Sequence, residues 1–307
     1  MENNQNSLIL VTGATGAQGG ATARALLGAG FSVRILTRDP TSSAAQEITK
    51  LGASVVAGDF EDVVSLREAV SGAYGVFSVQ LPDSSGTDAE RRHGYALIEA
   101  ARQAGVRHFV HTSVCEAGKH ESFPRWGTHY WWEKYWTDKW DVEQAVRHAG
   151  FDRWTVLKPA FMMENFATPK AAFMFPHLCK GRIVTALAPD TRMQLVAADD
   201  VGAFAQEAFE RPELFAGCSI DLAAEALTMN EVASTLGRVL GKRVNARSVS
   251  PAEAREAGLF PGWVRSQEWT NEVGYRADIE ALKAYGVPLT TFEAWVARHA
   301  AHIEIDA

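Results

Sequence analysis

Two side chains that can move a proton lie four residues apart, at Tyr135 and Lys139. Residues at this spacing share one face of a helix, so the phenol and the ammonium would lie about one turn apart. A free phenol has a pKa of about 10, and a nearby cation favours its phenolate form. Lys139 is therefore expected to lower the pKa of Tyr135, which would donate a proton to a substrate oxygen. Ser113, after a predicted strand, would hydrogen-bond the same oxygen.

This spacing arises by chance in many chains, so its value depends on the elements around it. Near the start, an apolar run over 8–11 meets the glycine-rich turn Gly13-Ala-Thr-Gly-Ala-Gln-Gly-Gly20, and a helix-forming run over 21–27 follows at once. Glycines let a backbone approach phosphates closely, and a helix N-terminus offers free N–H groups to an anion. We therefore expect a dinucleotide diphosphate to bind at Gly13, Thr15, Gly16, Ala17, Gln18 and Gly19. A structural turn without a ligand is the alternative.

Strand and helix patterns alternate through the first half of the chain. The predicted strands cover 32–37, 53–57, 75–79, 108–112 and 154–157, and the predicted helices cover 44–51, 62–70, 89–104 and about 130–148. Such alternation predicts an α/β fold, a Rossmann-type doubly wound parallel sheet with a smaller C-terminal α+β lobe. We expect a nucleotide domain over 1–158 and a mainly substrate-side lobe over 159–307, some of whose segments return to the sheet. In this half we predict strands at 193–197, 219–222 and 242–249 and helices at 199–209, 228–240 and 291–301.

The composition excludes several classes of function. The formal net charge of −7 over 307 residues makes nucleic acid an unfavourable direct partner. The three cysteines have no paired spacing, which argues against a disulfide framework or a metal site and fits a reducing cytosol. The stretch from Met1 to Ser7 is polar, and no apolar run is long enough to span a bilayer, so we expect a cytoplasmic location.

The end of the second predicted strand bears on coenzyme choice. An acid there would bind the ribose hydroxyls of NAD, whereas a basic group would bind the 2′-phosphate of NADP. Both types are present, and we favour Arg38 as the phosphate ligand and Asp39 as the start of a turn. Asp59 and Phe60 follow the third strand, where an adenine edge would lie; a loop acid and a core aromatic are the equal alternative.

A tryptophan-rich segment surrounds the Tyr135–Lys139 pair. Trp132, Trp136 and Trp140 repeat every four residues, which favours one buried face against the sheet or another helix. Trp126 and Trp131, at the loop end, are the candidates for an aromatic wall beside a planar substrate. The histidines of this region show no metal spacing. The same helix could equally serve a homodimer.

Five motifs together resemble the NmrA-like branch of the atypical short-chain dehydrogenase/reductase superfamily. They are Thr12–Gly20, Thr37–Pro40, Gly58–Phe60, Asp138–Glu143 and Leu157–Phe166. The resemblance implies an NADP(H)-binding Rossmann fold in which the glycine loop and Arg38 bind phosphates and Lys139 reaches the ribose. It also implies that Phe161 and Asn165 line the nicotinamide side, although the residues alone would suggest a packed aromatic and a loop cap. We further place Gln80, after the fourth strand, among the coenzyme-binding residues.

The family resemblance leaves two functions open. Some members look like redox sensors that bind NADP and change protein partners, and others are reductases. Many sensor-like members lack the tyrosine of the catalytic pair, whereas this chain has Tyr135. We therefore favour an NADPH-dependent reductase of a carbonyl or conjugated hydrophobic small molecule, with a non-catalytic NADP(H) sensor and its regulatory partner as the alternative. Lys158, where many relatives carry arginine, has no interpretation from sequence.

Overall fold

Seven short, largely buried runs form one parallel sheet in the computed structural model, which describes residues 7–82 and 86–306. Most of the polar N-terminal stretch therefore lies outside the described residues. The strands are β1 (Leu8–Val11), β2 (Ser32–Thr37), β3 (Ser54–Ala57), β4 (Gly75–Ser78), β5 (His108–Thr112), β6 (Arg153–Pro159) and β10 (Cys218–Leu222). Their order is β10-β6-β5-β4-β1-β2-β3, and β1 pairs with both β2 and β4. The strand order reverses there, which is where ligands bind in open α/β sheets.

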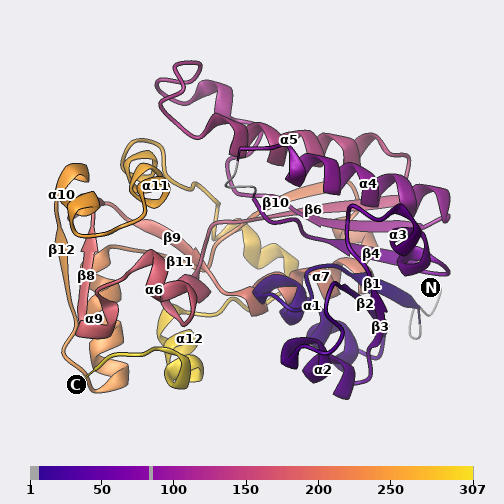
Figure 1. Ribbon diagram of the computed structural model, residues 1–307, viewed down its shortest axis with the longest axis horizontal. Helices are drawn as coiled ribbons and strands as arrows, with labels where there is room; N and C mark the ends of the chain where they lie inside the picture. Colours follow the sequence, from indigo (N-terminus) through magenta and orange to yellow (C-terminus); the bar gives the residue numbers. More distant parts are fainter. Residues whose placement is uncertain (1–6, 83–85, 307) are drawn as a thin grey trace.

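Helices cover both faces of this sheet (Figure 1). One face carries α1 (Ala17–Gly28), α2 (Ser43–Lys50) and α7 (Ala198–Glu210), and the other carries α3 (Val63–Val70), α4 (Ala89–Gln103) and α5 (Glu133–His148). The central strand β1 contributes to two cores, since Ile9 and Val11 pack on the first face and Leu10 on the second. Burial on both faces explains the continuous apolar runs in the sequence and confirms the predicted doubly wound fold.

A smaller lobe is built by the C-terminal half. Its strands are β7 (Phe161–Met162), β8 (Arg182–Thr185), β9 (Met193–Val196), β11 (Glu225–Leu227) and β12 (Asn245–Ser248), paired as β11-β9-β7 and β12-β8. Its helices are α6 (Lys170–Met174), α9 (Met229–Leu240), α10 (Pro251–Glu256), α11 (Pro261–Glu272) and α12 (Phe292–His299), with short 3₁₀ turns at 163–166, 178–180 and 300–302. A capping box begins α9, because Thr228 Oγ1 accepts a hydrogen bond from the Glu231 amide at 3.2 Å and the Glu231 carboxylate accepts one from the Thr228 amide at 2.8 Å.

Three further short elements complete the chain: α8 (Pro212–Phe215) and the 3₁₀ turns at 120–122 and 281–285. Two elements that follow residue 158, β10 and α7, belong to the layers of the large sheet, because β10 pairs with β6 and α7 packs on α1. The lobe boundary at that residue stays a prediction. Within the described residues, no helix has the length and apolarity needed to cross a membrane.

Candidate functional site

The glycine loop between β1 and α1 is folded so tightly that side chains would not fit. Gly13 has φ +62°, and a Cβ on it would lie 2.6 Å from Val79 Cγ1. A Cβ on Gly19 would lie 2.4 Å from the Gly13 carbonyl oxygen, to which the Gly16 amide donates at 2.9 Å. Thr12 Oγ1 accepts from the Val79 amide at 3.0 Å and ties the loop to the end of β4. The first amides of α1 have no partner in the helix, so the loop fits a diphosphate.

Arg38 lies directly after β2 with an exposed side chain. Among the described residues it makes no ion pair, so its guanidinium is available to a phosphate. Asp39 has another use: its carboxylate accepts from the amide and hydroxyl of Thr41 at 2.9 and 2.6 Å. These hydrogen bonds hold the pKa of Asp39 below its usual value. Asp39 therefore starts a turn, as predicted.

Asp59 and Phe60 lie at the neighbouring end of β3. Asp59 Oδ1 accepts from the amides of Glu61 and Asp62 at 2.8 and 3.2 Å, which orders the loop before α3. The Phe60 ring is partly buried and stacks on His93 with centroids 5.3 Å apart. These contacts match the alternative of a loop acid and a packed aromatic. Their role toward an adenine stays a prediction.

The Tyr135–Lys139 pair lies on α5, as the spacing predicts, but its electrostatics differ from the expectation. Lys139 is only 6% exposed, and its ammonium forms an ion pair with Glu90 of α4. Lys139 Nζ lies 5.9 Å from the centroid of the Tyr135 ring. Burial raises the pKa of Tyr135 well above its ordinary value, and Tyr275 and Glu90 add to this. The expected lowering by Lys139 is therefore wrong for this arrangement, in which Tyr135 keeps its proton.

Buried polar side chains are linked by hydrogen bonds at the ends of β4 and β5. The Ser78 hydroxyl lies 3.2 Å from His111 Nδ1 and accepts from Gln80 Nε2 at 2.9 Å. Burial, followed by the positive charge of Lys139, lowers the pKa of His111 to about 3. The imidazole of His111 is therefore neutral at physiological pH.

Several buried polar atoms near the strand ends have no hydrogen-bond partner within the described part of the protein. They are Gln18 Oε1, Gln80 Oε1, His111 Nε2, Thr112 Oγ1 and Ser113 Oγ. Such atoms are costly, and in folded proteins they concentrate at sites that bind or react with something else. Four of the five belong to the ends of β4 and β5, and the fifth to the start of α1. This group fits the polar ribose and amide parts of a dinucleotide.

An aromatic cluster joins the loop before α5 to the C-terminal lobe. Trp269 of α11 is 3% exposed and lies 4.8 Å from Trp136 and 5.6 Å from Phe123, between ring centroids. Trp126 is partly buried against Phe123 and His120, whereas Trp131 is 4% exposed and donates from Nε1 to the Pro124 carbonyl. Of the two candidate wall residues, Trp126 keeps the more accessible ring, and both roles stay predictions.

Charged groups add further contacts between the loop before α5 and α11. Tyr130 Oη donates to Glu268 at 2.7 Å, and its ring lies between the guanidinium groups of Arg125 and Arg265, 3.7 and 3.8 Å from its centroid. Arg125 also forms an ion pair with Glu272. We call this set of contacts between residues 123–136 and α11 the interlobe bridge.

The predicted tryptophan stripe is only partly correct. Trp136 is buried against another helix, α11, which is one of the two predicted environments. Trp140 packs over Gly118, and Trp132 is 42% exposed just before α5 begins. The three side chains therefore have three different environments, because α5 extends past the sheet toward the second lobe (Figure 1).

Phe161 and Asn165, implied by the resemblance to line the nicotinamide side, follow β6. Phe161 is 5% exposed, and its ring stacks on Trp263 with centroids 5.0 Å apart, inside the core of the C-terminal lobe. Asn165 is partly buried in the 3₁₀ turn over 163–166. The structure thus places Phe161 as a packed aromatic, and contact of either residue with a coenzyme stays a prediction.

The structure assigns a local role to Lys158. Its Nζ donates to the Ala117 carbonyl at 2.7 Å and lies 3.7 Å from Asp221 and 3.9 Å from Glu143. Lys158 therefore anchors the loop after β5, which begins at Ser113. Sequence reasoning missed this contact, and it also missed Glu90, whose place in the first turn of α4 looks like an ordinary favourable helix-end acid.

Within the part of the chain that the structure describes, residue types that bind metals gather at Cys115, Glu116 and Asp221. Lys119 lies 3.0 Å from Glu116 and 3.7 Å from Asp221, so a cation already compensates both carboxylates. Burial raises the pKa of the Cys115 thiol to about 12, which opposes the thiolate that a metal requires. This group does not have the chemistry of a metal site.

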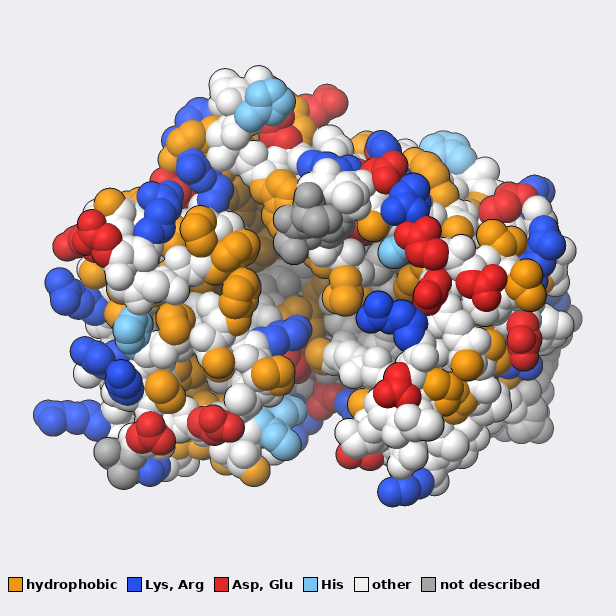
Figure 2. Space-filling view, viewed as in Figure 1, with side chains coloured by type: hydrophobic (Ala, Val, Ile, Leu, Met, Phe, Trp, Pro, Cys, Tyr) orange, Lys and Arg blue, Asp and Glu red, His pale blue; other side chains and the backbone are white. Residues whose placement is uncertain are grey.

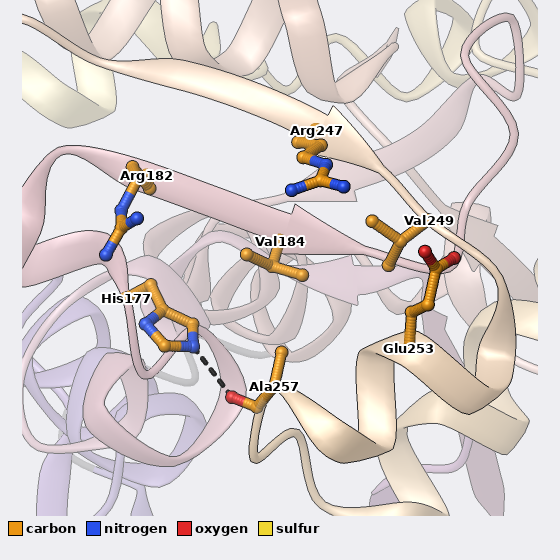
Figure 3. A pocket seen from close by; sticks show the side chains of 7 residues that line it. All are labelled: His177, Arg182, Val184, Arg247, Val249, Glu253 and Ala257. Atoms are coloured by element: carbon orange, nitrogen blue, oxygen red, sulfur yellow. Dashed lines mark hydrogen bonds between the residues drawn. The ribbon is translucent and has the colours of Figure 1, made fainter.

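The molecular surface is hollowed between the sheet and the smaller lobe (Figure 2). A separate groove of about 300 Å³ lies within the C-terminal lobe (Figure 3). There Arg182 and Arg247 project from β8 and β12 on either side of Val184, and His177 Nε2 donates to the Ala257 carbonyl at 2.7 Å. None of the predicted site residues lines this groove.

Fold and site together define a Rossmann-type nucleotide-binding protein with a second lobe beside its ligand edge. The chain belongs to the NmrA-like family, whose model matches residues 5–296. It is 30% identical over 303 residues to a (4-alkanoyl-5-oxo-2,5-dihydrofuran-3-yl)methyl phosphate reductase of Streptomyces griseus, covering 95% of this chain and 98% of the relative. It is 28% identical over 307 residues to an NAD(P)H azoreductase of Xenophilus azovorans, with 96% and 98% coverage.

Solved structures support the same fold. The NADPH-dependent quinone oxidoreductase of Escherichia coli, crystallised with NADPH, matches with a TM-score of 0.71 at 22% identity, covering 95% of this chain and 99% of that one. The negative transcriptional regulator NmrA in complex with NADP matches with a TM-score of 0.73 at 21% identity, covering 95% of each chain. The fold therefore occurs in both a reductase and a regulator.

Proposed function

We propose that this protein is an NADPH-dependent reductase of a carbonyl or conjugated hydrophobic small molecule. The observation that carries the proposal is the group of unpartnered buried polar atoms at the ends of β4 and β5, together with the Tyr135–Lys139 pair on α5. Two relatives of nearly full-length similarity support it, because they are named as reductases.

The residues present fit NADP(H). The glycine loop would hold its diphosphate, Arg38 its 2′-phosphate, and Gln80 and Lys139 its nicotinamide ribose. When bound, the coenzyme supplies a hydride. We also propose that Asp59, Phe60 and Asn165 contact the bound coenzyme.

The protein's own part is to hold and deliver a proton. Tyr135 keeps its proton on the phenol oxygen because burial disfavours the phenolate. Negative charge that develops on a substrate oxygen would draw this proton, and the Ser113 hydroxyl would stabilise the same oxygen. The interlobe bridge would exclude water from one side of the site, and its aromatic rings favour an apolar substrate.

One observation favours the alternative of a non-catalytic NADP(H) sensor. The Tyr135 phenol has a raised pKa and Lys139 is already neutralised by Glu90, so the pair lacks the activation expected of a catalytic couple. The sensor would bind the coenzyme equally well and would need a protein partner. We infer a cytoplasmic location for either function, and a homodimer stays a prediction.

Replacement of Tyr135 by Phe tests the reductase. Oxidation of NADPH is followed with quinones, enones, aldehydes and imines, and kcat of Tyr135→Phe should fall about 10²-fold or more because one general acid is lost. NADPH affinity should not change. Tyr95→Phe, which removes an exposed hydroxyl on α4, is the matched control and should behave as the wild type. Equal turnover by Tyr135→Phe would remove the tyrosine from the mechanism.

The screen itself separates the two functions. Tight NADPH binding with no oxidation by any acceptor class would refute the reductase. A protein partner whose affinity depends on the NADP redox state would then support the sensor.

A further inference from the structure

Glu90 and Lys139 form an ion pair that is almost completely removed from solvent. Glu90 lies in the first turn of α4 and is 3% exposed, and Lys139 on α5 is 6% exposed. Removing two charges from water costs several kcal/mol per ion, and such pairs often contribute no net stability. A buried pair next to the proposed proton donor therefore points to a role beyond holding the two helices together.

The other charged side chains near the pair already have partners of their own. Lys134 lies 2.7 Å from Asp138, and Arg91 lies 3.1 Å from Asp141. Over residues 7–82 and 86–306, Glu90 is the one carboxylate that forms an ion pair with Lys139. The charge on Lys139 Nζ is therefore balanced by a single group.

All other ionisable neighbours of the pair are either uncharged at neutral pH or lie in ion pairs of their own. The elements that face the pair contribute Arg91 and His93 on α4, Tyr135, Asp138 and Asp141 on α5, His111 on β5, and Tyr275 of the C-terminal lobe. Tyr135 and Tyr275 have raised pKa values and His111 has a lowered one, in each case mainly through burial. The pair and its buried neighbours thus carry no net charge.

We propose that Glu90 is a positioning residue of the site: its carboxylate fixes Lys139 Nζ beside the Tyr135 ring and cancels the ammonium charge there. This role deepens the proposed reductase function and rests on it for its catalytic meaning. The electrostatic claim stands apart from turnover, because it concerns protons on Tyr135 and Lys139 in the free protein.

Glu90→Gln tests the proposal while keeping the shape of the side chain. The variant leaves Lys139 as a buried ammonium without a counter-ion and removes a negative charge from near the phenol. Both changes make it easier for the Tyr135–Lys139 pair to lose its first proton, as a phenolate or as a neutral amine. We expect this first loss to move at least about one pH unit lower than in the wild type, a tenfold change in the proton equilibrium.

The measurement is an NMR titration of protein carrying ¹³C at Lys Cε and Tyr Cζ. Tyr135→Phe and Lys139→Met assign the two resonances. Glu99→Gln is the matched control, since Glu99 lies on the same helix but pairs with Arg102 at the surface, 51% exposed, and should not move either resonance. Glu90→Asp retains the charge but withdraws it by one methylene, and should give a smaller shift in the same direction.

Unchanged titration of both resonances in folded Glu90→Gln would overturn the proposal. So would a loss of stability alone, measured by urea unfolding, with no shift of either resonance. If Glu90→Gln does not fold, Glu90→Asp decides in the same way. In active protein, the alkaline limb of kcat/KM should shift with the NMR midpoint. A titration shift in a protein without reductase activity would support the charge balance and reject only the reductase.

Discussion

Replacement of His111 by Gln should make the protein markedly less sensitive to acid. The imidazole is 2% exposed, and burial lowers its pKa from the ordinary 6.5 to about 3. Between these two pH values the His111 imidazole is protonated in the unfolded chain but not in the folded protein. Stability from this residue is therefore fully present above pH 6.5 and declines as the pH falls through that window.

The size of the effect follows from the two pKa values. At pH 5 the unfolded imidazole is almost fully protonated and the folded one is not, so the wild type loses about 2 kcal/mol of unfolding free energy relative to pH 7.5 through this group. His108 has a similarly lowered pKa and Asp200 a raised one, about 6, but both remain in the variant and cancel in the comparison.

Urea unfolding of wild type and His111→Gln at pH 7.5 and pH 5 measures this difference. The variant can be less stable at pH 7.5, because Gln packs differently beside Ser78, but its loss between the two pH values should be about 2 kcal/mol smaller. His302→Gln, which removes an exposed imidazole, serves as the control. Equal pH dependence in wild type and His111→Gln would show that His111 is protonated in the folded protein and would contradict a neutral imidazole at this position.

Two further predictions concern the coenzyme and the bridge. Arg38→Ala should weaken NADPH binding about 10- to 100-fold, the value of a charge-assisted hydrogen bond, and should leave NADH binding within about twofold; calorimetry showing equal losses for both coenzymes would contradict the assignment. Trp269→Ala should lower the unfolding free energy by about 3–5 kcal/mol, because it empties a site between Trp136 and Phe123; a loss below about 1 kcal/mol in urea unfolding would show that the interlobe bridge is loosely packed.

The sheet and its first-half helices were predictable because their signals are local. The helix predicted over 89–104 is observed as Ala89–Gln103, and Gly105 adopts φ +73° just beyond it. The strand predicted over 108–112 is observed without change as β5. Apolar runs and glycine stops act within a few residues, so one sequence carries them.

Pairing between distant segments was not predictable in the same way. Glu90 meets Lys139 only because α4 and α5 pack side by side on one face of the sheet, and neither residue differs in type from a surface charge. Trp136 repeats at helical spacing, which predicts burial but not the partner, and the partner proved to be α11 of the other lobe. β8, which the sequence analysis did not predict, forms a strand because its backbone pairs in parallel with β12.

The protonation state of Tyr135 also depends on distant segments, so the spacing on α5 alone could not predict it. Spacing on α5 places a cation near the phenol and so predicts an acidic tyrosine. Burial of Tyr135 raises its pKa instead, and Tyr275 and Glu90, both from distant segments, add to this. Because burial keeps the proton on the phenol, a proton donor of this kind would give it up only when charge develops on a bound substrate. Burial also strengthens the pull of such a developing charge on the proton, because electrostatic interactions are screened less inside a protein than in water. A high pKa in the resting protein is therefore compatible with catalysis.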